Sequence, residues 1–401
     1  MKHEIVIVGS GHAGGMLAIF LRKYKYRGKI TIIGNENFLP YQKPGLSKQF
    51  LAGEIEQERL YLRNPDFFKR NNISLILNTG VISVNRVDQT LLLGNKKLIE
   101  YKTLVLATGS RVNKINNDNN DTCYLRTIND SIRLRSLLKS SNKISIVGAG
   151  FIGLEIAAIS IKKGLEVEVI ENSNRVLSRV VSQEMSSFFQ GKHKSEGVNF
   201  TFNTSVSKII KKNNSYEIVL KNNTTKQSDI VAIGIGVKPN IKIAEEAGLK
   251  CNNGIVVDEN CITSDKNILA IGDCTYHPNK IFNTHFRLES VQNAVDQALT
   301  ASKFLLGVPE PYNEVPWFWS DQYNISLQIA GISDHYDDLI IRGSIEQEKF
   351  SILFFKEGKL TGIESINSPK DFVSSKKIIK NSIKIDKALL QNDNFNLKKV
   401  L

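Results

Sequence analysis

The sequence predicts an α/β fold built from two similar β-α-β units, followed by a smaller α+β domain at the C-terminus. Three observations lead to this prediction. An apolar run enters a glycine-rich turn at residues 9–14, the same pattern returns at residues 148–153, and short alternating segments follow from about residue 317. The 401 residues are too many for one compact core and suit two or three domains.

The first β-α-β unit begins close to residue 1. We expect a strand over residues 5–8, a helix over residues 13–24 and a second strand over residues 29–33. Residues 35–47 then predict a long polar connection that contains proline, and residues 104–107 predict a further buried strand. Because the first strand starts at once, we expect no cleavable signal before it.

The pattern restarts after an asparagine-rich segment, residues 113–121, which is typical of a surface linker. We expect a strand over residues 143–147, a helix over residues 154–163 and a strand over residues 166–170. A third strand followed by a glycine turn is expected at residues 268–271.

The C-terminal part has a different character. The segments 326–330, 338–342 and 350–355 alternate or are apolar and are separated by short polar turns. Such segments predict antiparallel strands. We therefore expect an α+β domain there.

The first glycine turn has the composition of a dinucleotide-binding turn. Gly9 permits a tight strand-to-helix turn, Gly11 lets the backbone approach a pyrophosphate, and Gly14 lets the helix pack closely on the strand. Phosphates bind at the free N–H groups of such a helix start. An acceptor for ribose hydroxyls is expected after the second strand, where either Asn35 or Glu36 could serve.

The second glycine turn, with Gly148, Gly150 and Gly153, has the same context. Its second strand is followed by Glu171, and a carboxylate there accepts from a free 2′-hydroxyl and repels a 2′-phosphate. The turn is therefore predicted to prefer NADH to NADPH. The alternative is that the arginines following Glu171 shift the preference toward NADPH.

Two such turns in one chain predict two dinucleotides. Two NAD molecules would have no redox purpose, whereas FAD with NAD gives a hydride acceptor and a hydride donor. We therefore expect a tightly bound FAD, with NADH as the substrate.

Composition excludes several other classes of protein. The net charge of +13 is spread over the chain without a helix-turn-helix, zinc-finger or basic-arm pattern, so we expect no nucleic-acid partner. No apolar run is long enough to cross a membrane. The four cysteines have no metal-ligand spacing and are expected to be reduced thiols of a cytoplasmic protein. The alternative use of the charge is to dock an acidic protein.

Several segments together resemble the FAD-dependent ferredoxin reductases, the class that includes putidaredoxin, rhodocoxin and dioxygenase ferredoxin reductases. The segment Pro-Trp-Phe-Trp-Ser-Asp-Gln-Tyr at residues 316–323 is the most specific of them. Two departures stand out: Gly45 replaces a proline that is frequent in the class, and Asn35 replaces the ribose-binding acid of many relatives. The other matching segments are residues 30–34, 40–48, 107–111, 124–127, 271–274 and 287–290.

The resemblance implies a fold with two Rossmann-like domains, of the glutathione-reductase type, and a C-terminal α+β domain. Residues 1–112 and 240–316 would form a discontinuous FAD-binding domain, residues 113–239 an NAD-binding domain and residues 317–401 the C-terminal reductase domain.

The glycine turns and the resemblance together give the expected binding residues. For FAD these are Gly9, Gly11, Ala13, Gly14, Asn35, Glu36, Lys43, Lys48, Val81, Ala107, Arg126, Asp273 and Val291. For NAD they are Gly148, Gly150, Ile152, Gly153, Glu155, Glu171, Arg179 and Gly236.

The resemblance also implies the catalytic residues. Lys48 would lie beside the reactive edge of the flavin and pair with Glu155, where a fixed cation stabilises negative charge. Trp319 would lie near the flavin ring, Asp273 would bind the ribityl chain and Val291 would contact the flavin. The alternatives are a purely structural Lys48–Glu155 ion pair and a tryptophan that only packs.

The absence of a cysteine before Cys123 bears on the electron acceptor. Disulfide and peroxide reductases of this architecture carry a thiol in the stretch after the first β-α-β unit, so this chain is expected to pass electrons directly to an external acceptor. By resemblance the acceptor is an acidic [2Fe–2S] ferredoxin that serves a cytochrome P450 or a ring-hydroxylating oxygenase. Its docking surface is expected near Lys280, Arg287, Lys376 and Lys377.

Two alternatives remain open at this point. The acceptor could be rubredoxin or a small molecule such as a quinone, or the protein could be a redox-signalling flavoprotein of the apoptosis-inducing-factor type.

Overall fold

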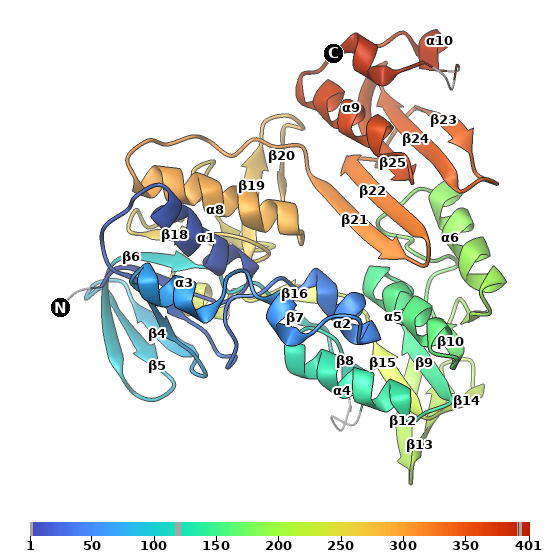
Figure 1. Cartoon of the computed structure of the whole chain (residues 1–401), viewed down its shortest axis with the longest axis horizontal. Coiled ribbons are helices and arrows are strands. Elements are labelled where there is room, and N and C mark those ends of the chain that lie inside the picture. Colours follow the sequence, from blue (N-terminus) through green and yellow to red (C-terminus); the bar gives the residue numbers. More distant parts are fainter. Residues whose placement is uncertain (1–2, 117–121, 391, 393–394) are drawn as a thin grey trace. The chain divides into compact units, whose positions relative to one another are not determined.

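The computed structural model describes residues 3–116, 122–390, 392 and 395–401, which form two compact units (Figure 1). The first unit consists of Met1–Lys43, Gln57–Arg111 and Lys238–Pro316, and the second of Pro44–Glu56, Val112–Val237 and Trp317–Leu401. The three-domain boundaries stay a prediction. The grouping of residues 44–56 with the second unit is a feature that the sequence did not indicate.

The first unit is built on a mixed sheet with the strand order β3-β2-β1-β6-β5-β4, and β18 pairs with the far half of β6. The strands β3, β2, β1, β6 and β18 are parallel neighbours, whereas β4 and β5 join antiparallel to the first half of β6. Its elements are β1 (His3–Val8), α1 (His12–Lys23), β2 (Ile30–Ile33), η2 (Gln57–Leu60), α3 (Pro65–Arg70), β3 (Ile73–Ile76), β4 (Val81–Asn85), β5 (Thr90–Leu93), β6 (Leu98–Leu106), α7 (Lys242–Glu246), β17 (Ile255–Val256), β18 (Ile268–Ala270), β19 (Thr275–Asn279), β20 (Thr284–Phe286) and α8 (Val291–Leu305).

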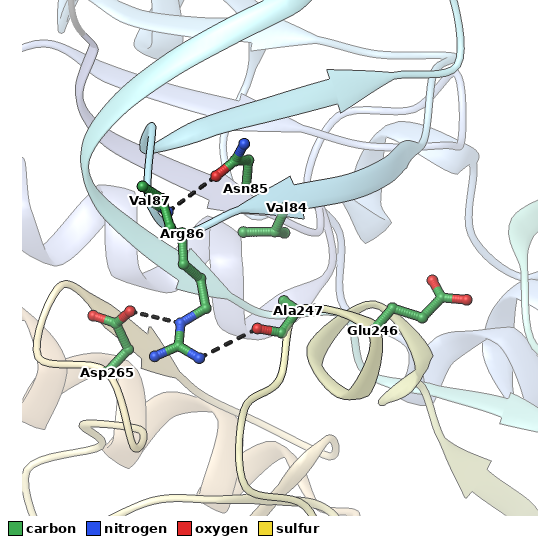
Figure 2. A pocket seen from close by; sticks show the side chains of 7 residues that line it. All are labelled: Val84, Asn85, Arg86, Val87, Glu246, Ala247 and Asp265. Atoms are coloured by element: carbon green, nitrogen blue, oxygen red, sulfur yellow. Dashed lines mark hydrogen bonds and ion pairs between the residues drawn. The ribbon is translucent and has the colours of Figure 1, made fainter.

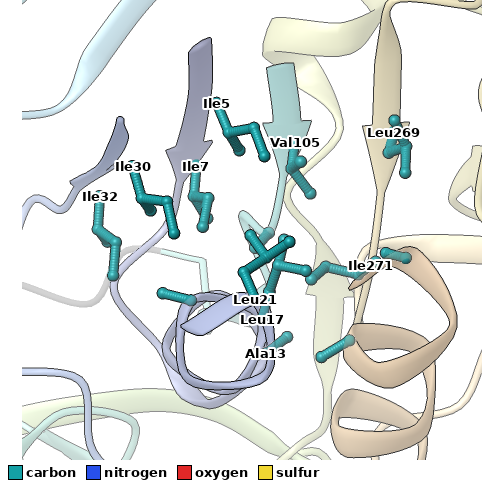
Figure 3. Close-up of a cluster of buried hydrophobic side chains, with 14 of the residues drawn as sticks. Ile5, Ile7, Ala13, Leu17, Leu21, Ile30, Ile32, Val105, Leu269 and Ile271 are labelled. Atoms are coloured by element: carbon teal, nitrogen blue, oxygen red, sulfur yellow. The ribbon is translucent and has the colours of Figure 1, made fainter. Parts of the chain in front are cut away.

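Alternation along β1 divides the core of the first unit between the two faces of this sheet. Ile5 and Ile7 join the cluster that contains Leu17 and Leu21 of α1 (Figure 3). Val6 and Val8 belong to a second buried cluster. Successive strand residues point to opposite faces, so both faces of this central strand are buried from Ile5 to Val8, and all four of these residues are apolar.

The described residues of the second unit form three sheets. The parallel sheet has the order β11-β10-β9-β15-β8, a small antiparallel sheet has the order β12-β13-β14, and the C-terminal antiparallel sheet has the order β21-β22-β25-β24-β23. Its elements are η1 (Pro44–Ser47), α2 (Gln49–Ala52), β8 (Cys123–Tyr124), α4 (Ile128–Lys139), β9 (Lys143–Val147), α5 (Phe151–Lys162), β10 (Glu166–Ile170), α6 (Gln183–Ser195), β11 (Asn199–Thr201), β12 (Val206–Lys212), β13 (Ser215–Leu220), β14 (Thr225–Ser228), β15 (Ile230–Ile233), β21 (Trp317–Gln322), β22 (Ile325–Gly331), β23 (Asp338–Ser344), β24 (Lys349–Lys356), β25 (Lys359–Ile366), α9 (Pro369–Lys380), α10 (Lys387–Leu390) and η3 (Leu397–Val400). The remaining strands, β7 (Ser110–Val112) and β16 (Val237–Pro239), contain two of the points where the chain passes from one unit to the other.

The α/β fold with two β-α-β units and antiparallel C-terminal strands is confirmed, and the corrections concern boundaries. Helix α5 begins at Phe151 and not at residue 154, because Gly150 is its N-cap. Strand β6 starts at Leu98, since its first half pairs with β5. Residues 44–47 form the short helix η1 and not the end of a plain connection. Of the predicted linker, residues 117–121 lie outside the described residues, and Asn113 donates its N–H to the Gly236 carbonyl at 2.9 Å.

Candidate functional site

The first glycine turn of the first unit has the geometry that a pyrophosphate requires. Gly9 has φ +121°, and a Cβ there would lie 2.0 Å from the Ala107 carbonyl oxygen. A Cβ at Gly14 would lie 2.1 Å from the Gly9 carbonyl oxygen, whereas a Cβ at Gly11 would meet no atom within 4 Å. Gly11 caps α1 without any side-chain hydrogen bond to the helix, and the first turn has no acid. Open space therefore faces the positive end of this helix, where an anion fits.

His12 lies inside this turn and was not predicted from the sequence. Its Nδ1 is buried and has no hydrogen-bond partner among the described residues. Burial lowers the pKa of His12 from 6.5 to about 4, opposed by Asp273 and reinforced by Lys43. A neutral ring with an unpaired buried nitrogen beside an anion-binding turn fits a bound polar ligand. In the sequence, His12 is marked only by its place at a variable position of the glycine motif.

Asp273 is brought next to the same turn. Ser110 donates its hydroxyl to the Asp273 carboxylate at 3.0 Å. The preceding Gly272 has φ +81°, and a Cβ there would lie 2.9 Å from the Cβ of Ala13. The turn that carries Asp273 is thus packed on the first turn of α1. The donors and acceptors around the first glycine turn fit a dinucleotide.

The two candidates for the ribose acceptor differ in their surroundings. The Glu36 carboxylate accepts from the Tyr41 hydroxyl at 2.8 Å and lies 3.7 Å from the Lys43 ammonium group, which itself lies 4.7 Å from the centre of the Tyr41 ring. Asn35 is exposed, and its side chain makes no hydrogen bond within the described residues. Glu36 is thus held in place by protein contacts, whereas the Asn35 amide is available.

The structure places the remaining predicted FAD residues as follows. Ala107 follows β6 and donates its N–H to Val8, Val81 begins β4, and Val291 begins α8. Arg126 belongs to the second unit, just before α4. Whether these residues contact FAD stays a prediction.

The second glycine turn, in the second unit, repeats the geometry of the first. Gly148 has φ +102°, and a Cβ there would lie 2.5 Å from the Gly234 carbonyl oxygen. A Cβ at Gly153 would lie 2.0 Å from the Gly148 carbonyl oxygen, and Gly150 again faces open space at the N-cap of α5. Ile152, one of the predicted NAD residues, is exposed in the first turn of this helix. A second pyrophosphate therefore fits here.

Glu171 is fixed against this turn by backbone donors. Its carboxylate accepts from the Ala149 N–H at 2.7 Å and from the Ser173 N–H at 2.8 Å. Arg175 donates to the carbonyl oxygens of Val181, Ser182 and Ser178, so its guanidinium closes a loop. The structure thus gives Arg175 a role other than neutralising a 2′-phosphate.

Arg179 is the other arginine considered for NADPH, and it is exposed. Its Nη2 would lie 3.5 Å from a Cβ built on Gly236, which has φ +93°. Arg179 and Gly236, which are both predicted to bind NAD, therefore lie close together.

Lys48 and Glu155 form a largely buried ion pair in the second unit. The Lys48 Nζ lies 2.6 Å from the Glu155 Oε1, and their side chains are 16% and 2% exposed. Glu155 also accepts hydroxyl hydrogen bonds from Ser47 and, at 2.6 Å, from Ser320. The predicted pairing of Lys48 with Glu155 is present, and the two serines were not predicted.

Besides the bonds to Glu155, further contacts hold the segment that carries Lys48 on α4 and α5. Ser131 donates to the Leu46 carbonyl at 2.8 Å, Lys163 donates to the Ala52 carbonyl at 2.9 Å, and the Arg135 guanidinium lies 4.8 Å from the Phe50 ring centre. These contacts fix the backbone on both sides of Lys48.

Trp319 is half-buried in β21, with its ring centre 5.5 Å from that of Trp317. Trp317 in turn packs on Phe372 and carries the Lys376 ammonium group 5.3 Å from its ring centre. The proximity of Trp319 to the flavin stays a prediction.

Of the four basic residues predicted to dock a partner, two are paired with acids in the first unit. Lys280 lies 3.2 Å from Glu259, and Arg287 pairs with Glu289. Lys376 and Lys377 lie on α9 in the second unit.

The thiols offer no redox centre. None of the four cysteines forms a disulfide, and burial raises the pKa of Cys251 to about 11 and raises the pKa of Cys261 and Cys274. Within the described ranges no cluster of His, Cys, Asp and Glu could hold a metal, and no helix is long and apolar enough to cross a membrane.

An open hollow in the first unit lies beside β4 and contains none of the predicted site residues (Figure 2). Its one guanidinium, that of Arg86, is bonded to Asp265 at 2.8 Å and to the Ala247 carbonyl at 3.3 Å. Its polar groups are thus satisfied within the protein, and we place no ligand there.

Two dinucleotide-binding turns, a buried lysine–glutamate pair and no reactive thiol define an α/β oxidoreductase that binds two nucleotides. A family model described as pyridine nucleotide-disulphide oxidoreductase matches residues 3–298, and one described as reductase C-terminal matches residues 317–401. The chain belongs to the pyridine nucleotide-disulphide oxidoreductase family and carries the reductase C-terminal domain. It is an FAD-binding, NAD(P)H-dependent oxidoreductase.

The individual relatives match over nearly the whole chain. Rhodocoxin reductase of Rhodococcus erythropolis is 40% identical over 98% of this chain and 93% of its own. The crystal structure of a ferredoxin reductase for the CYP199A2 system of Rhodopseudomonas palustris is 40% identical, with a TM-score of 0.95 over 99% of both chains. That of a covalent putidaredoxin reductase–putidaredoxin complex is 35% identical, with a TM-score of 0.95 over 99% of this chain and 98% of the other.

Proposed function

We propose that this protein is a cytoplasmic flavoprotein that passes electrons from NADH through FAD to an acidic [2Fe–2S] ferredoxin, which serves a cytochrome P450 or a ring-hydroxylating oxygenase. The observation that carries the proposal is similarity along the whole chain, at 35–40% identity, to a rhodocoxin reductase, to a ferredoxin reductase for the CYP199A2 system and to the putidaredoxin reductase of a complex with putidaredoxin. The four free thiols are ordinary in the reducing cytoplasm.

The first glycine turn is proposed to hold the FAD pyrophosphate. The N–H groups at the start of α1 would donate to the phosphates, and Asp273 would accept from the ribityl hydroxyls. His12 would offer its unpaired nitrogen to the same nucleotide. FAD, when bound, supplies a hydride acceptor that can release electrons singly.

The second glycine turn is proposed to hold NADH. Two backbone N–H groups of the turn hold the Glu171 carboxylate in one orientation. Its remaining lone pairs can then accept a hydrogen bond from a ribose hydroxyl. Its charge would repel a 2′-phosphate, and Arg175 is engaged elsewhere. This arrangement supports a preference for NADH.

Lys48 is the proposed catalytic cation. Its ammonium group is held by Glu155, and a pre-positioned cation stabilises negative charge without reorganisation during the reaction. The four cysteines form no disulfide that could take the electrons, which supports an external acceptor.

The proposal is tested with purified enzyme, NADH, cytochrome c as the final acceptor and a panel of acidic [2Fe–2S] ferredoxins. At least one ferredoxin should raise cytochrome c reduction well above the rate without it, and this gain should fall as salt is added. Stimulation by rubredoxin or by a quinone, with none by any ferredoxin, would contradict the proposal. A change of oligomeric state on NADH addition with negligible turnover would favour the signalling alternative.

A further inference from the structure

A continuous line of buried hydrogen bonds leads from Glu155 into the C-terminal part of the second unit. The Ser320 hydroxyl donates to Glu155 Oε1 at 2.6 Å, and the Gln322 amide donates to Ser320 Oγ at 3.1 Å. Gln322 Oε1 lies 2.7 Å from His193 Nε2, and the Tyr323 hydroxyl lies 3.0 Å from His193 Nδ1. We call Glu155, Ser320, Gln322, His193 and Tyr323 the Glu155 network.

The network joins three elements that are distant in the sequence. Glu155 lies on α5, Ser320 and Gln322 on β21, and His193 on α6. Ser320 and His193 are fully buried, and Gln322 is 2% exposed. Burying a polar side chain lowers the stability of the fold unless its hydrogen-bonding groups have partners. A line of linked buried side chains therefore specifies one arrangement of α5, α6 and β21.

The direction of the bonds follows from the protonation of His193. Burial lowers the pKa of His193 from 6.5 to about 4, against the opposing hydrogen bond to Gln322, so the ring is neutral at pH 7 and carries one N–H. Because the Gln322 amide nitrogen donates to Ser320, its oxygen faces His193 and requires the N–H on Nε2. Nδ1 then accepts from Tyr323, and every donor in the line points toward Glu155.

This line orients groups and does not conduct protons. A carboxamide has no proton to pass on without becoming an imidic acid, so Gln322 interrupts any relay between His193 and Ser320. What Gln322 does is to occupy one lone pair of the Ser320 hydroxyl and so turn its hydrogen toward Glu155. Tyr323 lies in the two-residue turn between β21 and β22, where its φ of +54° reverses the chain, and its hydroxyl meets the Nδ1 of His193.

We propose that Ser320, Gln322 and His193 are positioning residues that act on Lys48 through Glu155. Glu155 Oε1 receives both the Lys48 ammonium group and the Ser320 hydroxyl, so the direction of the hydroxyl fixes the oxygen that holds the cation. The inference rests on the proposed role of Lys48 in hydride transfer to FAD, and it does not depend on the identity of the electron acceptor.

The first test is spectroscopic and needs no turnover. In ¹⁵N-histidine NMR of the purified holoenzyme at pH 7, His193 should be neutral, with the proton on Nε2 and a bare Nδ1. The reverse tautomer, or a charged ring, would overturn the proposal because the Gln322 amide would then face the other way.

The second test is kinetic and measures flavin bleaching by NADH in a stopped-flow instrument, without ferredoxin. Gln322→Leu should slow hydride transfer about 10-fold while the apparent Kd for NADH changes less than about twofold, as for loss of a supporting hydrogen bond. His193→Leu should have a similar effect, and His193→Gln, which keeps an N–H donor, should restore part of the rate. Gln347→Leu, in the exposed turn between β23 and β24 of the same sheet, is the control and should leave the rate unchanged.

The outcomes separate the two proposals. An unchanged hydride-transfer rate in folded Gln322→Leu, or an equal loss in Gln347→Leu, would overturn the positioning role. If no ferredoxin is reduced while Gln322→Leu still slows flavin bleaching, the proposed acceptor fails and the positioning role stands. If the variants do not fold, the His193 tautomer in the unmodified enzyme still decides.

Discussion

Lys48 and Glu155 are separated by 107 residues in the sequence, yet Lys48 Nζ and Glu155 Oε1 lie 2.6 Å apart. Glu155 is 2% exposed and collects two hydroxyl donors besides the ammonium group. A buried carboxylate with this many donors is held in one orientation, and so is the cation bound to it.

Replacing Lys48 tests both stability and chemistry. Lys48→Met should lower the free energy of unfolding by about 3 kcal/mol, because it leaves a buried carboxylate without its cation. It should also slow NADH-dependent flavin reduction roughly 100-fold, the lower end of the cost of losing one preorganised contact to developing charge. The rate is measured by flavin bleaching and the stability by urea unfolding.

Lys162→Met is the matched control for Lys48→Met. Lys162 also pairs with the segment 44–56, through Glu54, but both side chains are exposed. Its loss should cost less than about 1 kcal/mol and leave the rate unchanged. Equal effects of the two substitutions would contradict the role given to Lys48.

The glycines of the first turn should separate binding from folding. Gly11→Val should leave the apoprotein folded, because a Cβ there would meet no protein atom within 4 Å, yet it should abolish tight FAD binding. Gly9→Ala should destabilise the apoprotein itself by roughly 1–3 kcal/mol or more, because Gly9 has a positive φ and abuts the Ala107 carbonyl. Thermal unfolding of the apoprotein and titration with FAD measure the two effects. Tight FAD binding by Gly11→Val would show that the pyrophosphate does not lie there.

Glu171 should control the choice of nicotinamide cofactor. Glu171→Ser should lower kcat/KM for NADH about 10-fold and raise it for NADPH, since the carboxylate that repels a 2′-phosphate is gone. Glu171→Gln keeps an acceptor for the Ala149 N–H and so separates loss of charge from loss of the turn's hydrogen bond. A ratio of the two kcat/KM values that does not move in either variant would remove Glu171 from the specificity site.

His277 should make the protein sensitive to acid. It is buried, neither ring nitrogen has a partner among the described residues, and burial, aided by His285, lowers its pKa from 6.5 to about 4. Between those pH values the unfolded chain binds a proton that the folded protein does not, so stability falls as the pH drops through this window.

The free energy of unfolding of His277→Leu, taken relative to that of the unmodified protein, should therefore be about 2 kcal/mol higher at pH 5 than at pH 7.5. Urea unfolding at the two pH values measures the difference, and His335→Leu, at an exposed position, should show none. A constant difference between His277→Leu and the unmodified protein at both pH values would mean that His277 is not held neutral by the fold.

Local signals account for most of what could be predicted from the sequence. Apolar runs that enter glycine turns predict the two β-α-β units, and Glu171 follows its strand at the distance that the nucleotide requires. The pairing of Lys48 with Glu155 came from the resemblance alone. No local pattern indicates it, because the two residues meet only through tertiary packing.

The missed features are of two kinds. His12 occupies a position of the glycine motif where any residue is allowed, so its orphaned nitrogen becomes visible only with the burial of its surroundings. The bonds of His193 and Tyr323 depend on α6 meeting the hairpin of β21 and β22, which periodicity cannot predict. The sequence also placed residues 44–47 in a plain connection, because their burial depends on α4 and α5.

The membership of residues 44–56 in the second unit has a consequence for synthesis. Leu46, Phe50 and Leu51 are buried there, but they leave the ribosome long before α4 and α5 have been translated. Until then these apolar side chains have no native surface to cover them, so the nascent chain carries an exposed hydrophobic segment. Truncated chains that end before residue 163 should therefore recruit chaperones and aggregate.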